Sequence, residues 1–459
     1  MSFSEYSDYE CSGFDWLGLI PRHWRTDKFR YVFTESNEKI ENEVVGEMLS
    51  VSGYRGIEIK IYDDENKRRT EEELQGYRIV RPGQLVVNTM WLNYAGLGVS
   101  NYEGHVSPAY RSYWINADVD LRFIHHLMRS SIYVQGYTQL LTGIRPNSLQ
   151  MSRDDLMGFP VVLAPRAEQT QIARFLDHET AKIDALIREQ VRLIELLQEK
   201  RQAVISHAVT KGLDPDVPMK DSGVEWLGEV PVHWEAARVK HVATFITSGP
   251  RGWSDFITEV SGDVFLQSGD LDDNLGLQLD TAKMVKPPAG AEGMRTKLKS
   301  GDVVVCITGA NTGRVAVVED LQRTTFINQH LSLIRTDVSQ IDPRYLAFSL
   351  SSLPGRSYFD VVQYGLKEGL SLSNVSEAPI ALPSVEEQEL IVKTLNKLIS
   401  KFNGLSKATS EKIALLKERR SALISAAVTG KIDVRNWQPP TDESAFDEEV
   451  RQAGMEATA

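Results

Sequence analysis

The sequence predicts an α+β protein in which two mixed α/β domains are separated by two long antiparallel helices that form a coiled-coil spacer, with an internal pseudo-twofold repeat. Three observations predict this architecture. A thirteen-residue segment occurs twice, a long helical pattern ends each half, and β-rich runs lie between. The length of 459 residues is that of two or more domains of ordinary size.

The repeat is visible at both ends of each half. "SGFDWLGLIPRHW" at residues 12–24 returns as "SGVEWLGEVPVHW" at residues 222–234, with eight of thirteen positions identical. "LQEKRQAVISHAVT" at residues 197–210 returns as "LKERRSALISAAVT" at residues 416–429, with nine of fourteen positions identical. Each half is therefore expected to have an opening segment, a globular part and a long helix.

The long helices are predicted from the spacing of apolar residues. From Glu168 to Thr210 the sequence has no Gly or Pro, and its apolar residues recur three and four positions apart, which places them in one stripe. The second copy has the same stripe, and Gly404 is a position where that helix could kink or divide. A small domain cannot bury so long a stripe, so we expect the two helices to pack on each other. The alternative is that each helix packs on its own globular part.

The globular parts are expected to mix strands and short helices. Gly83 and Gly301 each open a β-rich run, "GQLVVNTMWL" and "GDVVVCITGA". "VDLRFIHHLMRSS" from Val119 and "IDPRYLAFSLSS" from Ile341 have the spacing of short amphipathic helices. In the opening segments, the tryptophans are expected to pack against a helix end, and the two histidines, His23 and His233, are interpreted as structural.

The chain is predicted to divide into seven consecutive parts. They are an acidic N-terminal tail (1–13), a first globular domain (14–166), a first long helix (167–212), a linker (213–221), a second globular domain (222–384), a second long helix (385–430) and an acidic C-terminal tail (431–459).

Composition limits the class of protein. The net charge of −12 is concentrated near the two ends of the chain, where residues 1–15 carry four acidic and no basic side chains and residues 441–459 carry six acidic side chains against Arg451. The nearly balanced remainder neither excludes nor supports DNA binding.

Cys11 and Cys306 support neither a disulfide framework nor a zinc site, which is typical of a reducing cytoplasm. A transmembrane run and a secretory signal are both absent from the sequence, so we expect a cytoplasmic location without a membrane partner.

The motifs of common enzymes are incomplete. "TGANTGRV" has the glycines of a phosphate-binding loop, but no Lys-Ser/Thr follows Gly313. "GLGVSN" has Asn101 where a dinucleotide fingerprint needs its third glycine. "DPRY" has Arg344 where an amino-methyltransferase needs a second proline. Glu58 and Lys60 have the Glu-x-Lys spacing of metal-dependent nucleases, yet the triplet is short and lacks a counterpart in the second half. The sequence therefore predicts a protein that is not an enzyme.

The loops of both globular parts carry the residue types that contact nucleic acids. Arg and Lys bind phosphate and guanine, and Asn and Gln pair with adenine. Lys67, Arg68 and Arg69 also fit a merely solvated charge run. The candidate DNA-contacting residues are Tyr54, Arg55, Lys67, Arg68, Arg69, Asn88, Trp91, Asn93, Tyr94, Tyr110, Arg111, Arg145, Asn147, Ser248, Arg251, Trp253, Ser254, Asn311, Thr312, Arg314, Asn328, Gln329, His330 and Lys367.

The frame of the two halves matches, while these loops differ. A duplicated frame that presents two different faces is typical of an adaptor that reads two different half-sites. The chain also resembles the specificity subunits of type I restriction–modification systems, in "PRAEQTQI", "PSVEEQELI", "GEMLSVSGYRGI", "SGDVVVCITGANTGRVAVV", "FINQHLSLIR" and "WLGEVPVHW". These segments stand in order over nearly the whole chain. The first half departs by lacking a counterpart of the glycine-containing segment Gly309–Val315.

The resemblance implies a DNA-recognition subunit with no bound cofactor of its own. Each globular part would be a target-recognition domain for one half of a split, asymmetric site in double-stranded DNA, and the helices would separate them by about one DNA turn, roughly 34 Å. Two methyltransferase subunits would carry S-adenosylmethionine and methylate adenine N6, while two restriction subunits would use ATP and magnesium. The alternative is a DNA-reading or protein-binding scaffold of another phage-defence complex.

Overall fold

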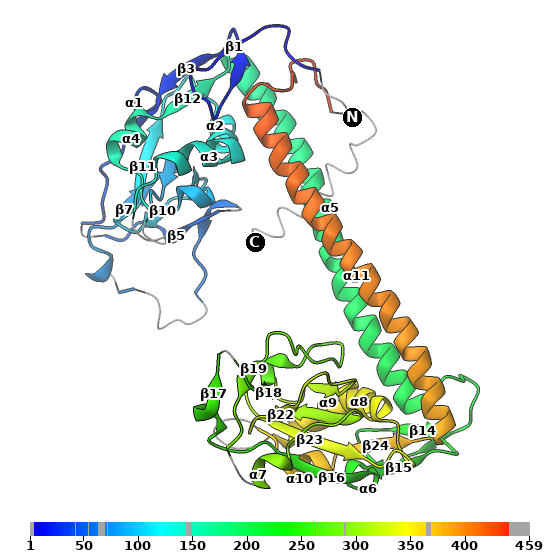
Figure 1. Cartoon of the computed structure of the whole chain (residues 1–459). Coiled ribbons are helices and arrows are strands. Elements are labelled where there is room, and N and C mark those ends of the chain that lie inside the picture. The colour runs from blue at the N-terminus through cyan, green and yellow to red at the C-terminus, as the bar shows by residue number, and fades with distance from the viewer. Residues whose placement is uncertain are drawn as a thin grey trace. The chain divides into compact units, whose positions relative to one another are not determined.

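The computed structural model describes residues 4–41, 43–53, 55–62, 69–70, 72–143, 149–259, 261–288, 291–363 and 369–439. The chain forms two compact units. Unit 1 comprises Met1–Val191 together with Ser410–Ala459, and unit 2 comprises Arg192–Thr409. Each unit contains one globular part and one half of each of the two long helices, which are labelled α5 and α11 in Figure 1.

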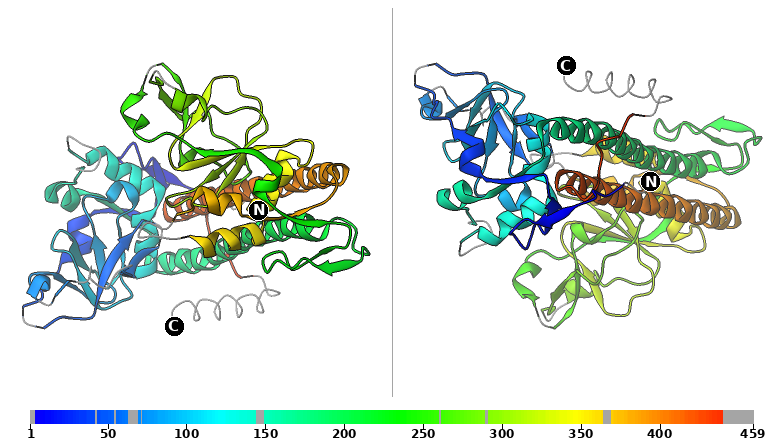
Figure 2. Two further views of the ribbon diagram at one scale, coloured as in Figure 1. Left: turned by 90° about the horizontal axis from the view of Figure 1, so that it is seen from below. Right: turned by 90° about the horizontal axis from the view of Figure 1, so that it is seen from above.

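The long helices are α5 (Arg166–Lys211) and α11 (Val385–Val428). Figure 2 shows them side by side in two further views. In unit 1 the beginning of α5 shares a core with the end of α11, and in unit 2 the end of α5 shares a core with the beginning of α11. These pairings confirm the antiparallel packing. Each pair of helix halves also packs on the globular part of its own unit, so both of the arrangements that the sequence left open occur together.

Helix α11 passes through Gly404 without a break. The division that the sequence left open at this glycine is therefore absent. Gly404 is exposed and lies within the continuous helix, where the cost of a glycine is about 1 kcal/mol relative to alanine. The apolar residues buried in the two cores hold both ends of this helix in place, which outweighs that local cost.

Both long helices end at a glycine with a left-handed backbone. Gly212 follows α5 with φ +78°, and Gly430 follows α11 with φ +70°. A Cβ on Gly430 would lie 2.3 Å from the Pro21 ring, so this position needs glycine for space as well as for conformation. The opening segment of unit 1 packs closely against the end of α11 for this reason.

The described strands of unit 1 form two four-stranded sheets and two antiparallel two-stranded sheets. The elements are β1 (Tyr9–Cys11), β2 (Leu19–Pro21), β3 (Arg25–Lys28), α1 (Phe29–Val32), β4 (Phe33–Glu35), β5 (Glu47–Ser52), β6 (Gly56–Ile59), β7 (Arg78–Val80), β8 (Leu85–Val87), β9 (Leu97–Val99), β10 (Gly104–Val106), β11 (Arg111–Ile115), α2 (Leu121–Arg129), α3 (Ser131–Leu140), α4 (Arg153–Gly158) and β12 (Pro160–Leu163). Short 3₁₀ turns cover Glu72–Leu74 and Leu92–Tyr94.

Unit 2 has a corresponding set of elements. They are β13 (Met219–Asp221), β14 (Glu229–Pro231), β15 (Glu235–Arg238), α6 (Val239–Val242), β16 (Ala243–Ser248), β17 (Ile257–Thr258), β18 (Asp263–Leu266), β19 (Lys283–Val285), α7 (Ala291–Met294), β20 (Asp302–Cys306), β21 (Val315–Val317), β22 (Thr325–Ile327), β23 (Leu331–Thr336), α8 (Pro343–Ser351), α9 (Leu353–Val362), α10 (Leu372–Ser376) and β24 (Pro379–Leu382). Short 3₁₀ turns cover Trp253–Phe256 and Ser268–Asp270.

The two units share the topology of one four-stranded sheet, while the strand order of their second sheets differs. The antiparallel sheet β4-β11-β8-β9 of unit 1 corresponds to β16-β23-β20-β21 of unit 2. In the second sheet of each unit a parallel pair recurs, β5 with β10 and β18 with β22. The predicted short helices are α2 and α8, and the predicted glycine-opened runs contain β8 and β20, so these sequence predictions are confirmed.

The opening segments are attached to the long helices by one glutamate in each unit. Glu168 accepts a hydrogen bond from Trp24 Nε1 at 3.0 Å and contacts His23 Nε2 at 2.7 Å. In unit 2, Glu387 contacts Trp234 Nε1 at 3.1 Å and His233 Nε2 at 3.0 Å. This contact accounts for the twice-repeated His-Trp pair and gives both histidines the structural role expected of them.

The glutamine that follows each glutamate holds the start of a short helix. Gln169 accepts a hydrogen bond from the backbone N–H of Asp120 at 2.8 Å, and Asp120 caps α2. Gln388 likewise accepts from the N–H of Asp342, the cap of α8, at 2.8 Å. The Glu-Gln pair therefore joins each long helix to both the opening segment and the short helix of its globular part.

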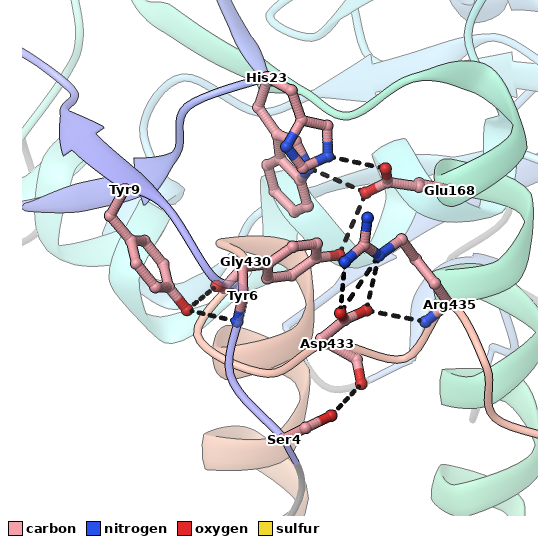
Figure 3. A network of polar contacts seen from close by, with 9 residues as sticks. Ser4, Tyr6, Tyr9, His23, Glu168, Gly430, Asp433 and Arg435 are labelled. Carbon is pink, nitrogen blue, oxygen red and sulfur yellow. Dashed lines mark hydrogen bonds and ion pairs between the residues drawn. The ribbon is translucent and has the colours of Figure 1, made fainter.

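In unit 1 the segment after α11 closes on the beginning of the chain (Figure 3). The N–H of Asp433 donates to the carbonyl of Ser4 at 2.7 Å, and Tyr9 donates to the carbonyl of Gly430 at 2.9 Å. Tyr6 donates to Glu168 at 3.1 Å and lies under the guanidinium of Arg435, whose ion pair with Asp433 lowers the pKa of that carboxyl. Residues close to the two ends of the chain thus contribute to one structure.

Among the described residues, no helix combines the length and the apolar character needed to cross a membrane.

Candidate nucleic-acid interface

Each unit carries its candidate residues mainly on three loops, two of which have counterparts in the other unit. In unit 1 these loops follow β5, join β8 to β9 and join β10 to β11. In unit 2 they follow β16, join β20 to β21 and join β22 to β23. Because β8 and β11 are antiparallel neighbours, as are β20 and β23, the last two loops of each set lie at the same end of a sheet.

Glycines bring the first two loops of unit 1 together. A Cβ on Gly53 would lie 2.5 Å from the carbonyl oxygen of Tyr94, so only a glycine allows this approach. Arg129, at the end of α2, then joins both loops. Its guanidinium donates to the carbonyls of Ser52 at 3.2 Å, Gly53 at 2.9 Å and Ala95 at 3.1 Å.

His125 fills the space between the same two loops. A Cβ on Gly56 or on Gly98 would lie 2.8 Å or 3.4 Å from its ring. The N–H of Val99 donates to His125 Nδ1 at 3.3 Å, so this ring nitrogen acts as an acceptor. Burial, followed by the charge of Arg129, lowers the pKa of His125 to about 3, and the ring is neutral at physiological pH.

Two exposed aromatic side chains mark the surface of this loop pair. Trp91 is 55% exposed and Tyr94 is 62% exposed, and their rings meet edge to face with centroids 6.1 Å apart. Exposed rings of this kind stack on bases or sugars. Asn93, between them, has a buried side-chain oxygen without a hydrogen-bond partner among the described residues.

The other described candidates of unit 1 are held by neighbours. Arg55 is exposed and pairs with Glu58 at 2.8 Å, and Arg69 lies over the ring of Tyr77 at 5.9 Å. Arg111 lies 3.6 Å from Glu35. Tyr110 hydrogen bonds Asn88, and burial raises the pKa of Tyr110. The last contact joins the loop between β8 and β9 to the loop between β10 and β11.

The loops of unit 2 make corresponding contacts through different residues. Asn311 donates to the carbonyl of Ser268 at 3.0 Å, and Arg314 donates to the carbonyl of Leu271 at 2.9 Å. The loop between β20 and β21 is therefore tied to the loop after β18, just as the equivalent loops are tied in unit 1. The first half lacks the Gly-x-x-Gly-x-Val sequence of Gly309–Val315, and in the equivalent place the structure has the loop of different sequence between β8 and β9.

A small cavity of about 140 Å³ gathers five candidate residues of unit 2. Trp253 and Ser254 come from the 3₁₀ turn before β17, while Asn328, Gln329 and His330 come from the loop between β22 and β23. Gln329 Nε2 lies 3.3 Å from His330 Nε2, and the Thr308 hydroxyl contacts His330 Nδ1. The structure thus brings together residues that lie more than seventy positions apart in the sequence.

Several candidates are buried in the loops and hold their shape. Asn88 and Asn328 accept hydrogen bonds from backbone N–H groups two positions ahead, and the hydroxyl of Thr312 donates to the carbonyl of Gly309. Trp253 is 4% exposed and packs on Phe265 and Phe326. Because these four side chains are buried, they are not accessible to a bound nucleic acid. Arg251, Ser254, Gln329 and His330 are exposed, and Ser248 is half-buried at the end of β16.

Six candidates, Tyr54, Lys67, Arg68, Arg145, Asn147 and Lys367, lie outside the described residues.

Sequence reasoning missed the residues that fix these loops, above all Arg129 and His125. Two signals were available. Both residues stand on a short amphipathic helix that follows these loops in the sequence, and glycines in and beside the loops leave room for a large side chain. As for the rejected nuclease site, Glu58 pairs with Arg55, and Lys60 lies over the Tyr62 ring at 4.9 Å. In the described part of the chain, no group of three or more His, Cys, Asp or Glu side chains is arranged to hold a metal ion.

Comparison with known proteins identifies relatives of both sequence and fold. Residues 231–415 match the family model of the type I restriction modification DNA specificity domain. The chain is 23% identical over 330 residues to the EcoBI specificity subunit of Escherichia coli, and 23% identical over 333 residues to the EcoKI specificity subunit of Escherichia coli strain K12. Each alignment covers 69% of this chain and 66% of the relative.

The fold has a solved counterpart. A chain from a structural study of complex assembly and conformational transition in the type I R-M system superposes with a TM-score of 0.65. The match covers 90% of this chain and 99% of that chain at 17% sequence identity. The two α/β domains and the paired long helices are therefore an architecture that another protein shares.

Proposed function

Since this chain belongs to the family of type I restriction–modification specificity subunits, we propose that it is the DNA-recognition subunit of such a system. It would read a bipartite, asymmetric target in double-stranded DNA, with one globular part for each half-site. The observation that carries this proposal is the repeated frame with different loops. Corresponding loops are tied together in both units, yet their side chains differ. The loop between β8 and β9 exposes Trp91 and Tyr94, whereas the equivalent loop between β20 and β21 carries the half-buried Asn311 and Arg314. The exposed Gln329 and His330 of unit 2 lie on the loop between β22 and β23.

Different exposed side chains on the same frame support two different half-sites. The aromatic pair of unit 1 offers stacking surfaces, and the amide and imidazole of unit 2 offer donors and acceptors for base edges. Exposed Arg55 and Arg251 supply charge for phosphates. The buried candidates and Arg129 would act indirectly, by fixing the shape of these loops.

The partners follow from the same proposal. Two methyltransferase subunits would bind the pseudo-twofold frame and carry S-adenosylmethionine, and two restriction subunits would use ATP and magnesium. This chain would contribute specificity and no chemistry. Methylation of an adenine inside a duplex requires the base to be turned out of the stack, which the methyltransferase subunits would do.

The first test is to express the chain together with the methyltransferase subunit encoded beside it and to map modified adenines across the host genome. We expect a motif of two short defined parts around a spacer of constant length. Exchanging residues 14–166 for the corresponding part of another specificity subunit should change one part of the motif only. A stable complex that leaves the genome without any such motif would instead indicate a scaffold of another defence complex.

A further inference from the structure

Unit 1 contains a basic cleft. Of the described residues that were predicted to contact DNA, Arg55 is the one that lines it. The cleft has a volume of about 710 Å³ and lies between the loop after β5, the junction of α2 with α3, the middle of α5 and the last turns of α11. All of its lining residues belong to unit 1. Five of them are arginine or lysine, namely Arg55, Arg129, Arg188, Lys417 and Arg420. Asp184 is the one lining carboxylate among the described residues.

Three of the five cations already have partners. Arg129 donates to loop carbonyls, Arg420 pairs with Asp184 at 2.9 Å, and Arg55 pairs with Glu58. Burial, followed by the nearby charge of Arg420, lowers the pKa of Arg129 to about 10.

The two remaining cations come one from each long helix. Arg188 of α5 and Lys417 of α11 are exposed, and neither makes an ion pair within the described part of the chain. They face the same cleft, at its helix side, while Gly53 and Arg55 of the candidate recognition loop line another side. Like charges gathered in a concave site raise the local potential for an anion.

The corresponding cleft of unit 2 supplies its own anions. It has a volume of about 550 Å³ and is lined by Arg201, Arg314 and Arg356 together with Asp272 and Asp273. Arg201 stands 219 residues before Arg420, which is the offset of the helix repeat. Here Arg201 donates to the carbonyl of Asp273 at 2.6 Å, and Arg314 pairs with the Asp273 carboxylate at 3.1 Å. In unit 1 Glu58 pairs with Arg55 from outside the lining, and among the described residues Asp184 is the one carboxylate that lines the cleft.

We propose that the basic cleft of unit 1 binds a phosphate of the DNA backbone, beside the half-site that the first globular part reads. The identification of the anion as DNA depends on the proposed function. Arg188 and Lys417 would contact the phosphate oxygens, because guanidinium and ammonium groups form charge-assisted hydrogen bonds with phosphate. Arg129 would act as a positioning residue that keeps the recognition loop at the edge of the cleft.

A phosphate contact of this kind fixes the position of the duplex without reading sequence. The cleft would therefore supply affinity, and the loops of the same unit would supply discrimination. This division of labour separates the proposal from one in which Arg188 or Lys417 reads a base.

The test is a double variant, Arg188→Ala with Lys417→Ala, in the full chain bound to its methyltransferase subunit. Its affinity for a duplex that carries the methylated motif is measured over a range of salt concentrations. We expect the slope of log affinity against log salt to become shallower by about 2, which means that wild type loses roughly tenfold more affinity than the variant between about 50 and 200 mM salt. The methylated motif should stay the same.

The matched control is Arg174→Ala with Arg419→Ala. These exposed arginines lie on the same two helices, do not line the cleft, and make no ion pair within the described residues, so the same charge is lost elsewhere. The control should keep the wild-type slope. An equal change in both double variants, or an unchanged slope in the cleft variant, would overturn the phosphate site. Wild-type binding without sequence preference would overturn the proposed function instead, and the comparison of slopes would still decide about the cleft.

Discussion

Gln169 and Gln388 are small parts of their helices, but their side chains are almost completely enclosed, at 3% and 0% exposure. Each amide accepts a hydrogen bond from the N–H of a helix cap and donates to the carbonyl just before its own helix. A leucine of similar size would leave these backbone groups buried and unpaired. An unpaired buried group costs about 1–3 kcal/mol.

We therefore expect Gln169→Leu and Gln388→Leu each to lower the free energy of unfolding by about 2–4 kcal/mol, because more than one backbone group loses its partner. Urea unfolding followed by circular dichroism measures this loss. Gln139→Leu, at an exposed position of α3, is the control and should change little. Wild-type stability in both buried variants would show that the amides are dispensable.

His125 makes the stability of unit 1 depend on pH. Its pKa in the folded chain is lowered to about 3, whereas an unfolded histidine titrates near 6.5. Between these values the unfolded chain binds a proton that the folded chain does not, so stability increases with pH. This contribution is fully present above about pH 6.5 and is lost as pH falls toward 3, at up to about 1.4 kcal/mol per pH unit.

We expect His125→Ala to flatten this dependence, which thermal unfolding at pH 7 and pH 5 would measure. Alanine already stands at the corresponding position of α8, as Ala347. His207→Ala removes an exposed histidine of α5 and should leave the dependence as in wild type. If the His125 variant kept the full wild-type difference between the two pH values, the buried ring would not be its source.

At the scale of elements, the length of α5 and α11 is expected to control the spacer of the target. Deleting residues 189–195 and 408–414 shortens each helix by roughly 10 Å and keeps the apolar stripe in phase, because seven residues are close to two turns. We expect both parts of the methylated motif to be unchanged and the spacer to lose about three base pairs. Mapping modified adenines measures this. A changed half-site with an unchanged spacer would contradict the role of the helices as a spacer.

The elements that the sequence predicts well are those with a strong repeating pattern. The apolar stripes of α5 and α11 and the amphipathic spacing of α2 and α8 are such patterns, and the structure has all four helices. Gly404 left a division of the second helix open, because a local helix propensity does not include the packing at both ends of α11.

The loops could be predicted only as a group. Their composition identified the segments that surround the candidate interface, but it did not say which side chains turn inward. Trp91 and Trp253 both follow a strand end in sequence, yet Trp91 is 55% exposed and Trp253 is 4% exposed. The difference depends on Phe265 and Phe326, which reach Trp253 from other strands, and contacts between distant segments leave no local pattern.

At the scale of the whole molecule, the two units differ in how the chain supplies them. Unit 2 is one continuous segment, Arg192–Thr409, whereas unit 1 takes Met1–Val191 from one end of the chain and Ser410–Ala459 from the other. The core of unit 1 includes Ile424, Ala427, Val428 and Val434 beside Trp24 and Phe123.

The closure between Ser4 and Asp433 has a consequence for the timing of synthesis. The first globular part leaves the ribosome before unit 2, but residues that cover Trp24 and Tyr6 are made only after unit 2. At about 5–20 residues per second, the ribosome needs several seconds more to make the second segment of unit 1 after Thr409, the final residue of unit 2. Synthesis of unit 1 therefore begins before that of unit 2 and is completed after it, so the core of unit 1 closes later than that of unit 2.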